Sequence, residues 1–496
     1  MAAGNALMGI DLGTTAVKVG LFSAEDGRML ALSTREYALE TPRAGWAELD
    51  PEIYWQCVRN GIEEVKHRAS DRRIASVGLS SQGQTFILLD EDCRPLRPAI
   101  VWLDTRGTDE AARLLDRLGP DAFRRHTGVP FPRPIASASK IMWLAKHEPK
   151  VWARTRRIAM LPEFIGYRLT GNFVCDPANM NSTGLRSAAG WWGDALRVAG
   201  IPREFFGKVK PSGEPIGTVA AAAAKELGIE PGVPVGAGSN DQLTGAIGVA
   251  GVRPGILSGA IGTAMAIIAT LPGDVESARP DVPVSNHAVA GLKYALTFSV
   301  TTGILLKWYR DHFAPEKTYD ELVDAASAVE PGADGLTLLP HFSGTAVPTF
   351  DPTVRGALLG LTLAHGEPHI VRAILEAVGF TVRDAHELMR ASFPLAWRAF
   401  RVLGGATRSP FWMQLIADIA RVPIEKPACG EAAVFGGALL GGVAAGILPD
   451  TVDAAERFYR CERVYDPGPD SKQYEKPYSR YREAMEKRYP GALGLT

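Results

Sequence analysis

Cysteine is scarce in this chain, and the few cysteines form no pattern suited to a cross-link or a metal. There are five of them, an odd number, scattered without a C-x-x-C pair. A disulfide framework or a structural zinc site needs paired, suitably spaced thiols, so neither is predicted. Reduced, mostly structural thiols are typical of the cytoplasm, and we expect a cytoplasmic protein.

The sequence also lacks an excess of either charge and a long uninterrupted apolar run. Lys and Arg number 54 against 55 Asp and Glu, a formal net charge of −1. That balance leaves no global basic field to hold nucleic acid or an anionic membrane, so a small molecule is the expected partner. The longest apolar stretch, residues 432–448, carries five glycines and falls just short of a membrane span. A glycine-rich helix packed in the protein core is predicted there.

Length and apolar content are what the chain does have. Its 496 residues, 46% hydrophobic and 22% charged, are enough for two substantial α/β domains and too apolar for a disordered protein. The density of glycine around residues 248–254 marks a hinge. We therefore expect an N-terminal domain over residues 1–250 and a C-terminal domain over residues 251–496.

The N-terminal region alternates in the manner of β-strands. From Leu7 to about Tyr37 the pattern predicts an antiparallel meander. A helix is expected over Ile53–Val65, followed by a buried strand over Ile74–Leu79. That strand ends in a polar cluster beginning at Ser80, and such strand ends are where α/β folds place ligands.

Two glycine-threonine turns occur in similar settings. Gly13–Thr15 follows Asp11 between two strand-like stretches, and Gly262–Thr263 repeats part of the pattern halfway along the chain. Such turns direct backbone N–H groups and hydroxyls into a concavity that binds phosphate oxygens. Asp11 has the wrong charge for phosphate unless Mg²⁺ lies between them. An ordinary hairpin turn is the alternative for either copy alone, but two copies favour two related lobes that bind a nucleotide.

Two further segments carry residue types suited to chemistry. Asp241 stands where an apolar strand ends and a helix begins, a position at which an aspartate is most often the helix N-cap. It could also be a general base, which needs a carboxylate on a rigid element facing a cleft, and one residue can fill both roles. Gly404 and Gly405 follow another strand and precede a helix from about Phe411. A purine or ribose could lie across them, although a plain strand-to-helix turn would use the same residues.

Taken together, these segments resemble the FGGY carbohydrate kinases, within the broader actin-like, sugar-kinase and heat-shock ATPase superfamily. The second family signature is matched at every position by residues 356–376. The first is matched by residues 137–140, Trp143 and His147, except that Ile135 stands where the family usually has a small or aromatic residue. The resemblance runs from Asp11 to about Leu448. It implies an α/β fold of two lobes, each ribonuclease H-like, with an interlobe cleft.

The resemblance also implies roles for individual residues. ATP would be bound by Gly13, Thr14, Thr15, Gly262, Thr263, Gly404, Gly405 and Ser409. Asp11 would lie near Mg²⁺, and Asp241 corresponds to the aspartate that acts as catalytic base on the sugar hydroxyl. ATP as co-substrate and Mg²⁺ are therefore the implied cofactors. A homodimer is the default expectation for such an enzyme.

The family builds its acceptor site from two loops. Their candidate residues in this chain are Gln82, Gln84, Trp102 and Asp104. Gln and Asp suit polyol hydroxyls and an indole face suits the C–H surface of a sugar, although Trp102 could also be a core aromatic residue. Glycerol kinases have Arg-Glu where this chain has Gly83 and Gln84, which argues against glycerol. Xylulokinases usually have Met-His after the glutamine, which this chain also lacks.

Spacing, length and the Trp-x-Asp-x-Arg run nevertheless resemble the xylulokinase branch most. D-xylulose is therefore the expected acceptor, with another ketose, a pentitol or gluconate as alternatives. A different class of function also stays open, because fold does not fix function: an actin-like ATPase or a sugar sensor without kinase activity.

Overall fold

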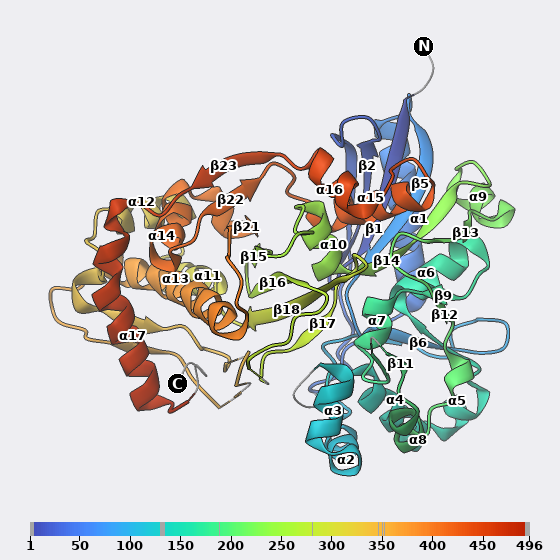
Figure 1. Ribbon diagram of the computed structural model, residues 1–496, viewed down its shortest axis with the longest axis horizontal. Helices are drawn as coiled ribbons and strands as arrows, with labels where there is room; N and C mark the ends of the chain where they lie inside the picture. Colours follow the sequence, from blue (N-terminus) through green and yellow to red (C-terminus); the bar gives the residue numbers. More distant parts are fainter. Residues whose placement is uncertain are drawn as a thin grey trace. The chain divides into compact units, whose positions relative to one another are not determined.

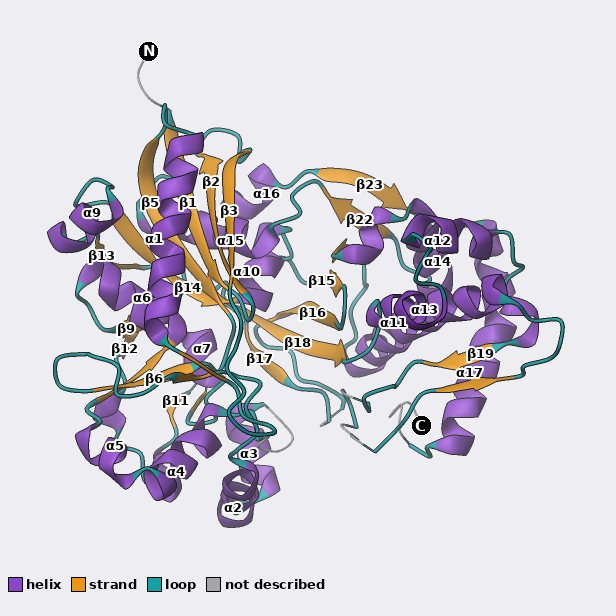
Figure 2. Cartoon of the chain, turned by 180° about the vertical axis from the view of Figure 1, so that it is seen from behind, coloured by secondary structure: helices purple, strands orange, loops and turns teal. Residues whose placement is uncertain are grey.

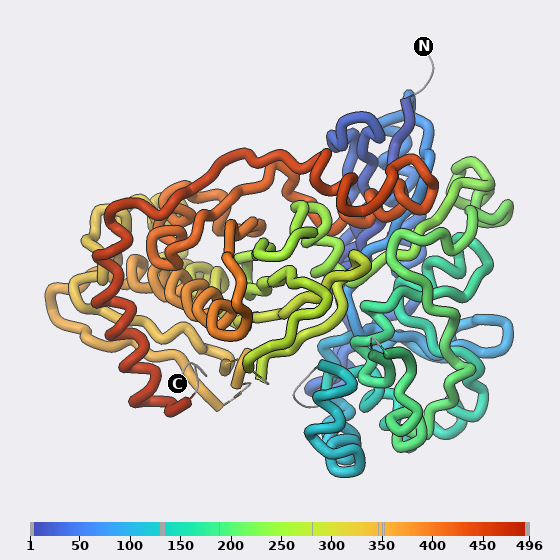
Figure 3. The backbone as a smooth tube through the Cα atoms, viewed as in Figure 1, coloured from blue at the N-terminus to red at the C-terminus, as the bar shows by residue number. Residues whose placement is uncertain are grey.

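The computed structural model describes residues 4–128, 134–187, 189–279, 281–345, 347–349, 351 and 353–491. The chain divides into two compact units, and Figures 1 and 3 show its course coloured along the sequence. Unit 1 comprises Met1–Val252, Ser285–Leu292 and Glu431–Tyr459. Unit 2 comprises Arg253–Val284, Lys293–Gly430 and Arg460–Thr496.

Unit 1 is built on a mixed sheet that contains the predicted meander. Its strands, in pairing order, are β13 (Pro215–Thr218), β14 (Pro234–Asn240), β5 (Arg73–Ser81), β1 (Asn5–Leu12), β2 (Ala16–Ser23) and β3 (Met29–Glu36). Strands β1, β2 and β3 pair antiparallel, which confirms the meander, and β5 pairs parallel with β1 and β14. The buried strand predicted over Ile74–Leu79 is β5.

Helices cover both faces of this sheet, as Figure 2 shows in purple and orange. One face packs on α1 (Pro51–Arg68), α6 (Leu161–Thr170) and α9 (Ala221–Leu227) through a single hydrophobic cluster. The opposite face packs on α15 (Ala432–Ala444), which in turn packs on α10 (Asp241–Gly248). The helix expected over Ile53–Val65 is α1, which is longer at both ends. It begins at Pro51 because Asp50 caps it and accepts a hydrogen bond from Glu52 N.

Helix α15 approaches the sheet at backbone distance. A Cβ on Gly9 would overlap the carbonyl oxygen of Val434, and a Cβ on Gly78 would overlap that of Gly437. Glycine on both surfaces is what permits this contact. The buried glycine-rich helix predicted within residues 432–448 is therefore confirmed.

This contact also places part of the C-terminal sequence in unit 1. The expected boundary at residue 250 lies close to the first change of unit, after Val252. The expected C-terminal domain, however, included Glu431–Tyr459, which packs with unit 1 because α15 covers the sheet there. Figure 3 shows this returning segment in orange-red beside the blue N-terminal strands.

Smaller elements complete unit 1. A second sheet pairs in the order β4 (Glu48–Leu49), β7 (Ala99–Ile100), β6 (Phe86–Leu89) and β8 (Arg157–Met160). Two short pairs are β9 (Val174–Cys175) with β12 (Lys208–Val209) and β10 (Arg186–Ser187) with β11 (Gly190–Trp191). The remaining helices are α2 (Thr108–Leu118), α3 (Pro120–Thr127), α4 (Ser137–His147), α5 (Pro149–Arg154), α7 (Pro177–Asn181), α8 (Gly193–Ala199) and α16 (Thr451–Phe458).

Unit 2 repeats the strand arrangement of unit 1. Its main strands, in pairing order, are β18 (Leu292–Ser299), β16 (Met265–Pro272), β15 (Ile256–Ile261), β21 (Ala399–Leu403), β22 (Ile424–Pro427) and β23 (Cys461–Tyr465). Strand β15 pairs antiparallel with β16 and parallel with β21, as β1 does with β2 and β5. The repeat confirms the predicted α/β fold with two ribonuclease H-like halves.

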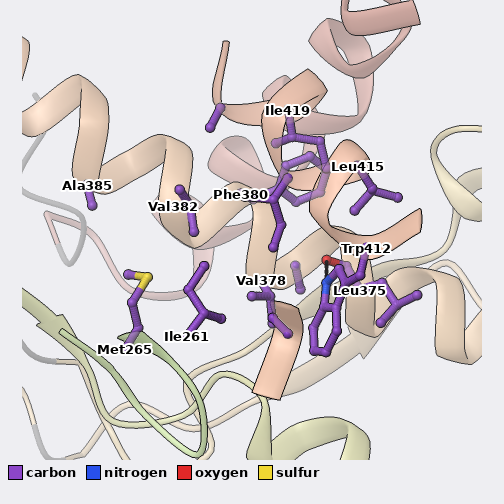
Figure 4. Close-up of a cluster of buried hydrophobic side chains, with 14 of the residues drawn as sticks. Ile261, Met265, Leu375, Val378, Phe380, Val382, Ala385, Trp412, Leu415 and Ile419 are labelled. Atoms are coloured by element: carbon purple, nitrogen blue, oxygen red, sulfur yellow. Dashed lines mark hydrogen bonds between the residues drawn. The ribbon is translucent and has the colours of Figure 1, made fainter. Parts of the chain in front are cut away.

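The core of unit 2 forms around a long amphipathic helix. Its helices are α11 (Ile304–Phe313), α12 (Tyr319–Ser327), α13 (Glu367–Ser392), α14 (Pro410–Ala420) and α17 (Glu475–Arg488), and β19 (Thr337–Leu339) pairs with β20 (Ala357–Leu359). Figure 4 shows α13 and α14 joined by apolar side chains such as Val378 and Leu415. Trp412 Nε1 donates to Leu375 O at 3.3 Å, which satisfies the polar atom of this buried indole.

Two further expectations bear on the class of protein. Across the described ranges, no helix combines the length and apolar character that a membrane crossing requires. All five cysteines are free thiols in the structure.

Candidate functional site

Three elements of unit 1 bring polar side chains together at the ends of β1 and β5 and the start of α10. Ser80 Oγ, at the end of β5, donates to Asp11 Oδ1 at 2.6 Å. The same hydroxyl lies 2.7 Å from Thr244 Oγ1 on α10. Asp241 precedes Thr244 by three residues, so both share one face of that helix. The structure thus links the two aspartates that the sequence singles out.

Asp241 is the first residue of α10 and not its cap. The cap is Asn240, whose Oδ1 accepts a hydrogen bond from Leu243 N at 2.9 Å, so the N-cap role predicted for Asp241 is wrong. Removal from water and, to a smaller extent, the negative charge of Asp11 raise the pKa of the half-buried Asp241 carboxyl to about 7. The nearby backbone N–H groups of Gln242 and Asp241 lower it in part. A general base works best with a pKa near the operating pH.

The Asp11 carboxylate is oriented by a hydrogen bond, but it forms no salt bridge in the described part of the chain. Burial raises its pKa, while the hydrogen bond from Ser80 and the charge of Lys18 lower it. Lys18 itself is paired with Glu431 at 2.6 Å. Among the residues that the structure describes there is no cluster of three or more acidic, His or Cys ligands. Mg²⁺ in phosphoryl-transfer sites takes one or two carboxylates plus substrate phosphates, so Asp11 with its oxygen donors fits that ion.

The turn between β1 and β2 holds the first candidate phosphate site. Gly13 N donates to Ala16 O at 3.0 Å, and Tyr37 Oη donates to Gly13 O. Within the described residues, the backbone N–H groups of Thr14 and Thr15 donate to no protein acceptor. These groups are therefore free to bind phosphate oxygens.

The loop after β7 carries Trp102 beside this turn. Trp102 Nε1 donates to Thr14 Oγ1 at 2.9 Å, and Trp102 N donates to Thr85 Oγ1 at 3.1 Å. Lys140 Nζ donates to Val101 O at 3.2 Å and to Trp102 O at 3.3 Å. Trp102 is half-buried at the margin of the core, so part of the residue remains exposed.

Asp104 lies in the same loop but has no free oxygen. Its side chain is fully buried and accepts from Ala47 N at 2.7 Å and from Arg106 Nε at 2.8 Å and Nη2 at 2.7 Å. Arg106 also bonds Glu48 at 2.5 Å and stacks over the Trp46 ring, 3.8 Å from its centroid. The geometry gives Asp104 a structural role in place of the predicted sugar contact, because its acceptor positions are occupied.

Gln82 and Gln84 follow the end of β5. Gln82 Nε2 donates to Tyr54 Oη at 3.1 Å. The side-chain oxygens of both glutamines are buried without a protein hydrogen-bond partner in the described part of the chain. Buried acceptors without partners cost stability, so each is ready to accept a hydrogen bond from a ligand hydroxyl.

Unit 2 carries the remaining candidates in one place. Gly262 N donates to Ala264 O at 3.0 Å, and Gly404 lies directly against that turn, since a Cβ there would fall 2.7 Å from Ile261 O. Gly404 has a φ of 96°, and nothing within 4 Å would meet a Cβ on Gly405. Open backbone of this kind suits a flat ligand. Thr263 belongs to the same exposed turn.

Ser409 differs from the other candidates in unit 2. Its Oγ accepts from Trp412 N at 3.1 Å and caps α14. The hydroxyl proton stays available as a donor, but the structure assigns Ser409 first to the helix cap.

Sequence reasoning missed the residues that support these side chains. Lys140, Ser80 and Thr244 were not singled out individually as site residues, although Lys140 lies in the first signature and Ser80 is the first polar residue after β5. Their roles depend on contacts between segments far apart in the sequence, which local patterns do not report.

Comparison with known proteins gives the family. Residues 6–248 match the N-terminal domain and residues 258–445 the C-terminal domain of the FGGY family of carbohydrate kinases. A gluconokinase of Bacillus subtilis (strain 168) is 30% identical over 94% of this chain and 92% of its own length. A glycerol kinase of Thermococcus gammatolerans is 30% identical over 97% of each chain.

Solved structures agree with the sequence relatives. The crystal structure of ligand-bound xylulose kinase from Lactobacillus acidophilus matches with a TM-score of 0.90 at 26% identity, covering 99% of this chain and 100% of that one. Three acceptors are thus named among relatives of similar identity, so family membership alone does not select the sugar. The two domain matches together span most of the sequence, and the chain belongs to the FGGY family of carbohydrate kinases, which are ATP-dependent.

Proposed function

We propose that this kinase transfers the γ-phosphate of ATP to a hydroxyl of a small neutral carbohydrate, with D-xylulose, forming D-xylulose 5-phosphate, as the first candidate. The observation that carries the proposal is the Asp241 carboxyl at the start of α10. Its pKa of about 7 lets it take a proton near neutral pH, and it lies close enough to Asp11 to feel that charge. The Trp102 loop and the first phosphate turn belong to the same unit.

In this mechanism the chain supplies position and charge. The acceptor hydroxyl attacks the γ-phosphorus, the bond from that phosphorus to the bridging oxygen of ADP breaks, and Asp241 takes the hydroxyl proton. Alignment of the hydroxyl with the γ-phosphate accounts for most of the acceleration, and a positioned base adds about 10²- to 10⁴-fold. The products are a sugar phosphate and ADP.

Asp11 is the residue that would hold Mg²⁺, which would neutralise phosphate charge when bound. The fit is supported by a half-buried carboxylate whose positively charged neighbour, Lys18, is itself paired with Glu431. Ser80 fixes the orientation of that carboxylate through its 2.6 Å hydrogen bond. In unit 1 the phosphates would be bound by Gly13–Thr15; in unit 2, Gly262–Thr263 would bind phosphate and Gly404–Gly405 would contact adenosine.

The charges around Trp102 favour a neutral acceptor. Arg106 is bound by Asp104 and Glu48, and Lys140 is fully buried on two backbone carbonyls. Arg106 Nη1 has no partner in the described part of the chain, but the two carboxylates offset the charge of Arg106, so little positive charge is left for the carboxylate of gluconate. The buried, unpartnered oxygens of Gln82 and Gln84 are acceptors for hydroxyl donors instead.

The residues at positions 83 and 84 argue against glycerol. A Cβ on Gly83 would meet Asn240 Cβ at 3.9 Å and Ser182 Oγ at 4.0 Å, which are ordinary contact distances. Packing alone therefore does not require glycine at position 83, and the absence of the Arg-Glu pair of the glycerol kinases is a difference in side-chain chemistry that argues against glycerol. Another ketose or a pentitol is the first alternative, and gluconate, the acceptor named for more than one relative, is the second.

A coupled ADP-release assay tests the proposal. The purified chain with MgATP is presented with D-xylulose, L-xylulose, D-ribulose, L-ribulose, xylitol, D-arabitol, erythritol, glycerol and gluconate. We expect turnover with neutral acceptors, highest with D-xylulose. Asp241→Asn should abolish this turnover. Asp109→Asn, an exposed carboxylate on α2, is the matched control and should retain full activity. ADP release that is the same with every acceptor and with none would favour an ATPase or a sensor.

The free thiols support a cytoplasmic enzyme.

A further inference from the structure

The indole of Trp102 joins the candidate acceptor loop to the first phosphate turn. Its Nε1 donates to Thr14 Oγ1 at 2.9 Å. Both residues are half-buried, and both belong to unit 1. This hydrogen bond is a direct contact between the loop expected to hold the sugar and the turn expected to hold phosphate.

The chemistry of the pair excludes Trp102 as the acceptor of the Thr14 proton. An indole N–H is a donor only, whereas a threonine hydroxyl has one proton and two acceptor positions. With Trp102 donating, the Thr14 proton must be donated to another group. The backbone N–H groups of Thr14 and Thr15 have no protein acceptor within the described residues. All three donors are then available to phosphate oxygens, and a hydrogen-bond chain strengthens each of its members.

Three further hydrogen bonds hold the backbone around Trp102. Lys140 Nζ donates to Val101 O and Trp102 O, and Trp102 N donates to Thr85 Oγ1. Lys140 is fully buried, and burial lowers its pKa to about 7. Because Lys140 donates hydrogen bonds to two carbonyls of this loop, it positions the loop and does not contact the sugar itself.

We propose, resting on the function proposed above, that the Trp102–Thr14 hydrogen bond couples acceptor binding to nucleotide binding, with Lys140 as a positioning residue for Trp102. An acceptor packed on the indole restrains the ring, and the ring in turn orients the Thr14 hydroxyl toward phosphate. The coupling is reciprocal, so nucleotide raises the affinity for acceptor by the same factor. Without acceptor the phosphate turn is less ordered and binds ATP more weakly.

A double-mutant cycle on nucleotide affinity tests the bond without any sugar. The probe is the Mg²⁺ complex of the non-hydrolysable β,γ-imido analogue of ATP, measured by calorimetry. Trp102→Phe keeps an aromatic ring and removes the N–H, and Thr14→Val keeps the shape and removes the hydroxyl. Trp102→Phe should weaken binding about 2- to 10-fold in the wild-type background and have no effect in the Thr14→Val background. Equal fold-changes in the two backgrounds would overturn the coupling.

A second arm measures the coupling itself. The dissociation constant of the same analogue is measured with and without the acceptor identified by the panel. The wild-type ratio should be about 5-fold or more, and it should fall toward one in Trp102→Phe and Thr14→Val. Thr14→Ser keeps the hydroxyl and should restore it. Lys140→Met should raise the acceptor KM more than it lowers kcat, whereas a merely structural loss would lower the amount of folded protein instead.

The arms separate the two proposals. If no acceptor in the panel is phosphorylated, the proposed function fails while the nucleotide cycle still reports on the Trp102–Thr14 bond. If an acceptor is phosphorylated and the wild-type ratio stays unchanged in Thr14→Val, the coupling alone fails. Thermal unfolding of each variant is recorded first, and Thr14→Val supplies the decisive comparison if Trp102→Phe does not fold.

Discussion

Asn240 and Asp241, neighbours in sequence, divide the start of α10 between them. Asn240 Oδ1 accepts the Leu243 N–H at 2.9 Å and caps the helix. Asp241 is thereby released from capping and stands at the positive end of the helix dipole, where a negative charge is favoured. Burial and the charge of Asp11 act in the opposite direction and raise its pKa to about 7. The balance leaves a carboxyl that can exchange a proton near neutral pH.

Separate substitutions at these two positions should have separate effects. Asp241→Asn should lower kcat about 10²- to 10⁴-fold with little change in acceptor KM, because it removes the base and keeps the shape. Asn240→Ala should instead cost about 1 kcal/mol of unfolding free energy through loss of the cap. Steady-state kinetics and urea unfolding of both variants test this division. A kcat for Asp241→Asn within a few-fold of wild type would rule out the base.

The pH dependence of the rate should report on the same carboxyl. Asp241 must be deprotonated to accept a proton, so kcat/KM for the acceptor should fall about tenfold per pH unit below a pKa near 7. Mg²⁺ beside Asp11 adds positive charge, so raising MgATP should move this limb to lower pH. The residual activity of Asp241→Asn should lack the limb. A wild-type profile that stays level down to about pH 5 would contradict the assignment.

The backbone contact between β5 and α15 should tolerate no side chain. A Cβ on Gly78 would overlap Gly437 O, a backbone atom that cannot rotate away. Gly78→Ala should therefore destabilise unit 1 by about 1 to 3 kcal/mol or more. Gly193→Ala, with nothing within 4 Å of the new Cβ, should stay near wild type. Urea unfolding compares the two, and equal stabilities would show that α15 does not pack as described.

Glu163 should make stability depend on pH. The residue is buried in α6, and burial raises its pKa from 4.5 to about 8. The folded protein then holds a proton that the unfolded chain has released, so its stability should fall as pH rises from about 4.5 to about 8. Asp176, with a pKa raised to about 6, acts with the same sign.

Substitution isolates the Glu163 contribution. Glu163→Gln cannot ionise at this position. The melting temperature of the variant minus that of wild type should therefore increase as pH rises from about 4.5 to about 8. Asp109→Asn, exposed on α2, should follow the wild-type curve. A Glu163→Gln curve parallel to wild type across that range would show that this carboxyl does not titrate between the two states.

Much of the fold was predictable because local patterns of apolar residues and glycine indicate its strands and turns. Alternating strands gave β1, β2 and β3, and the two glycine-threonine turns lie at equivalent places in the two repeated sheets. The return of α15 to unit 1 was not predictable in this way. Its position depends on glycines in β1 and β5 more than 300 residues away, and local propensity carries no information about such contacts.

The charged residues of the candidate site were predictable from the sequence, whereas the hydrogen bonds that they make were less so. Asp241 was identified, but its capping role was not distinguished from that of Asn240, because Asn and Asp cap helices about equally well. Asp104 was assigned to the sugar, since nothing in the run around it shows that Ala47 N and Arg106 occupy its oxygens. The role of Lys140 in positioning Trp102 is not predictable from sequence, because its acceptors are backbone carbonyls, which every residue carries.

Phosphorus NMR of a reaction mixture tests the central claim most directly. The chain is incubated with MgATP and D-xylulose, and in parallel with each other acceptor, and the fate of the γ-phosphate is followed. The account predicts a sugar-phosphate resonance that grows in step with ADP, is strongest with D-xylulose, and is absent with Asp241→Asn. Release of inorganic phosphate alone, with no sugar phosphate from any acceptor, would contradict it.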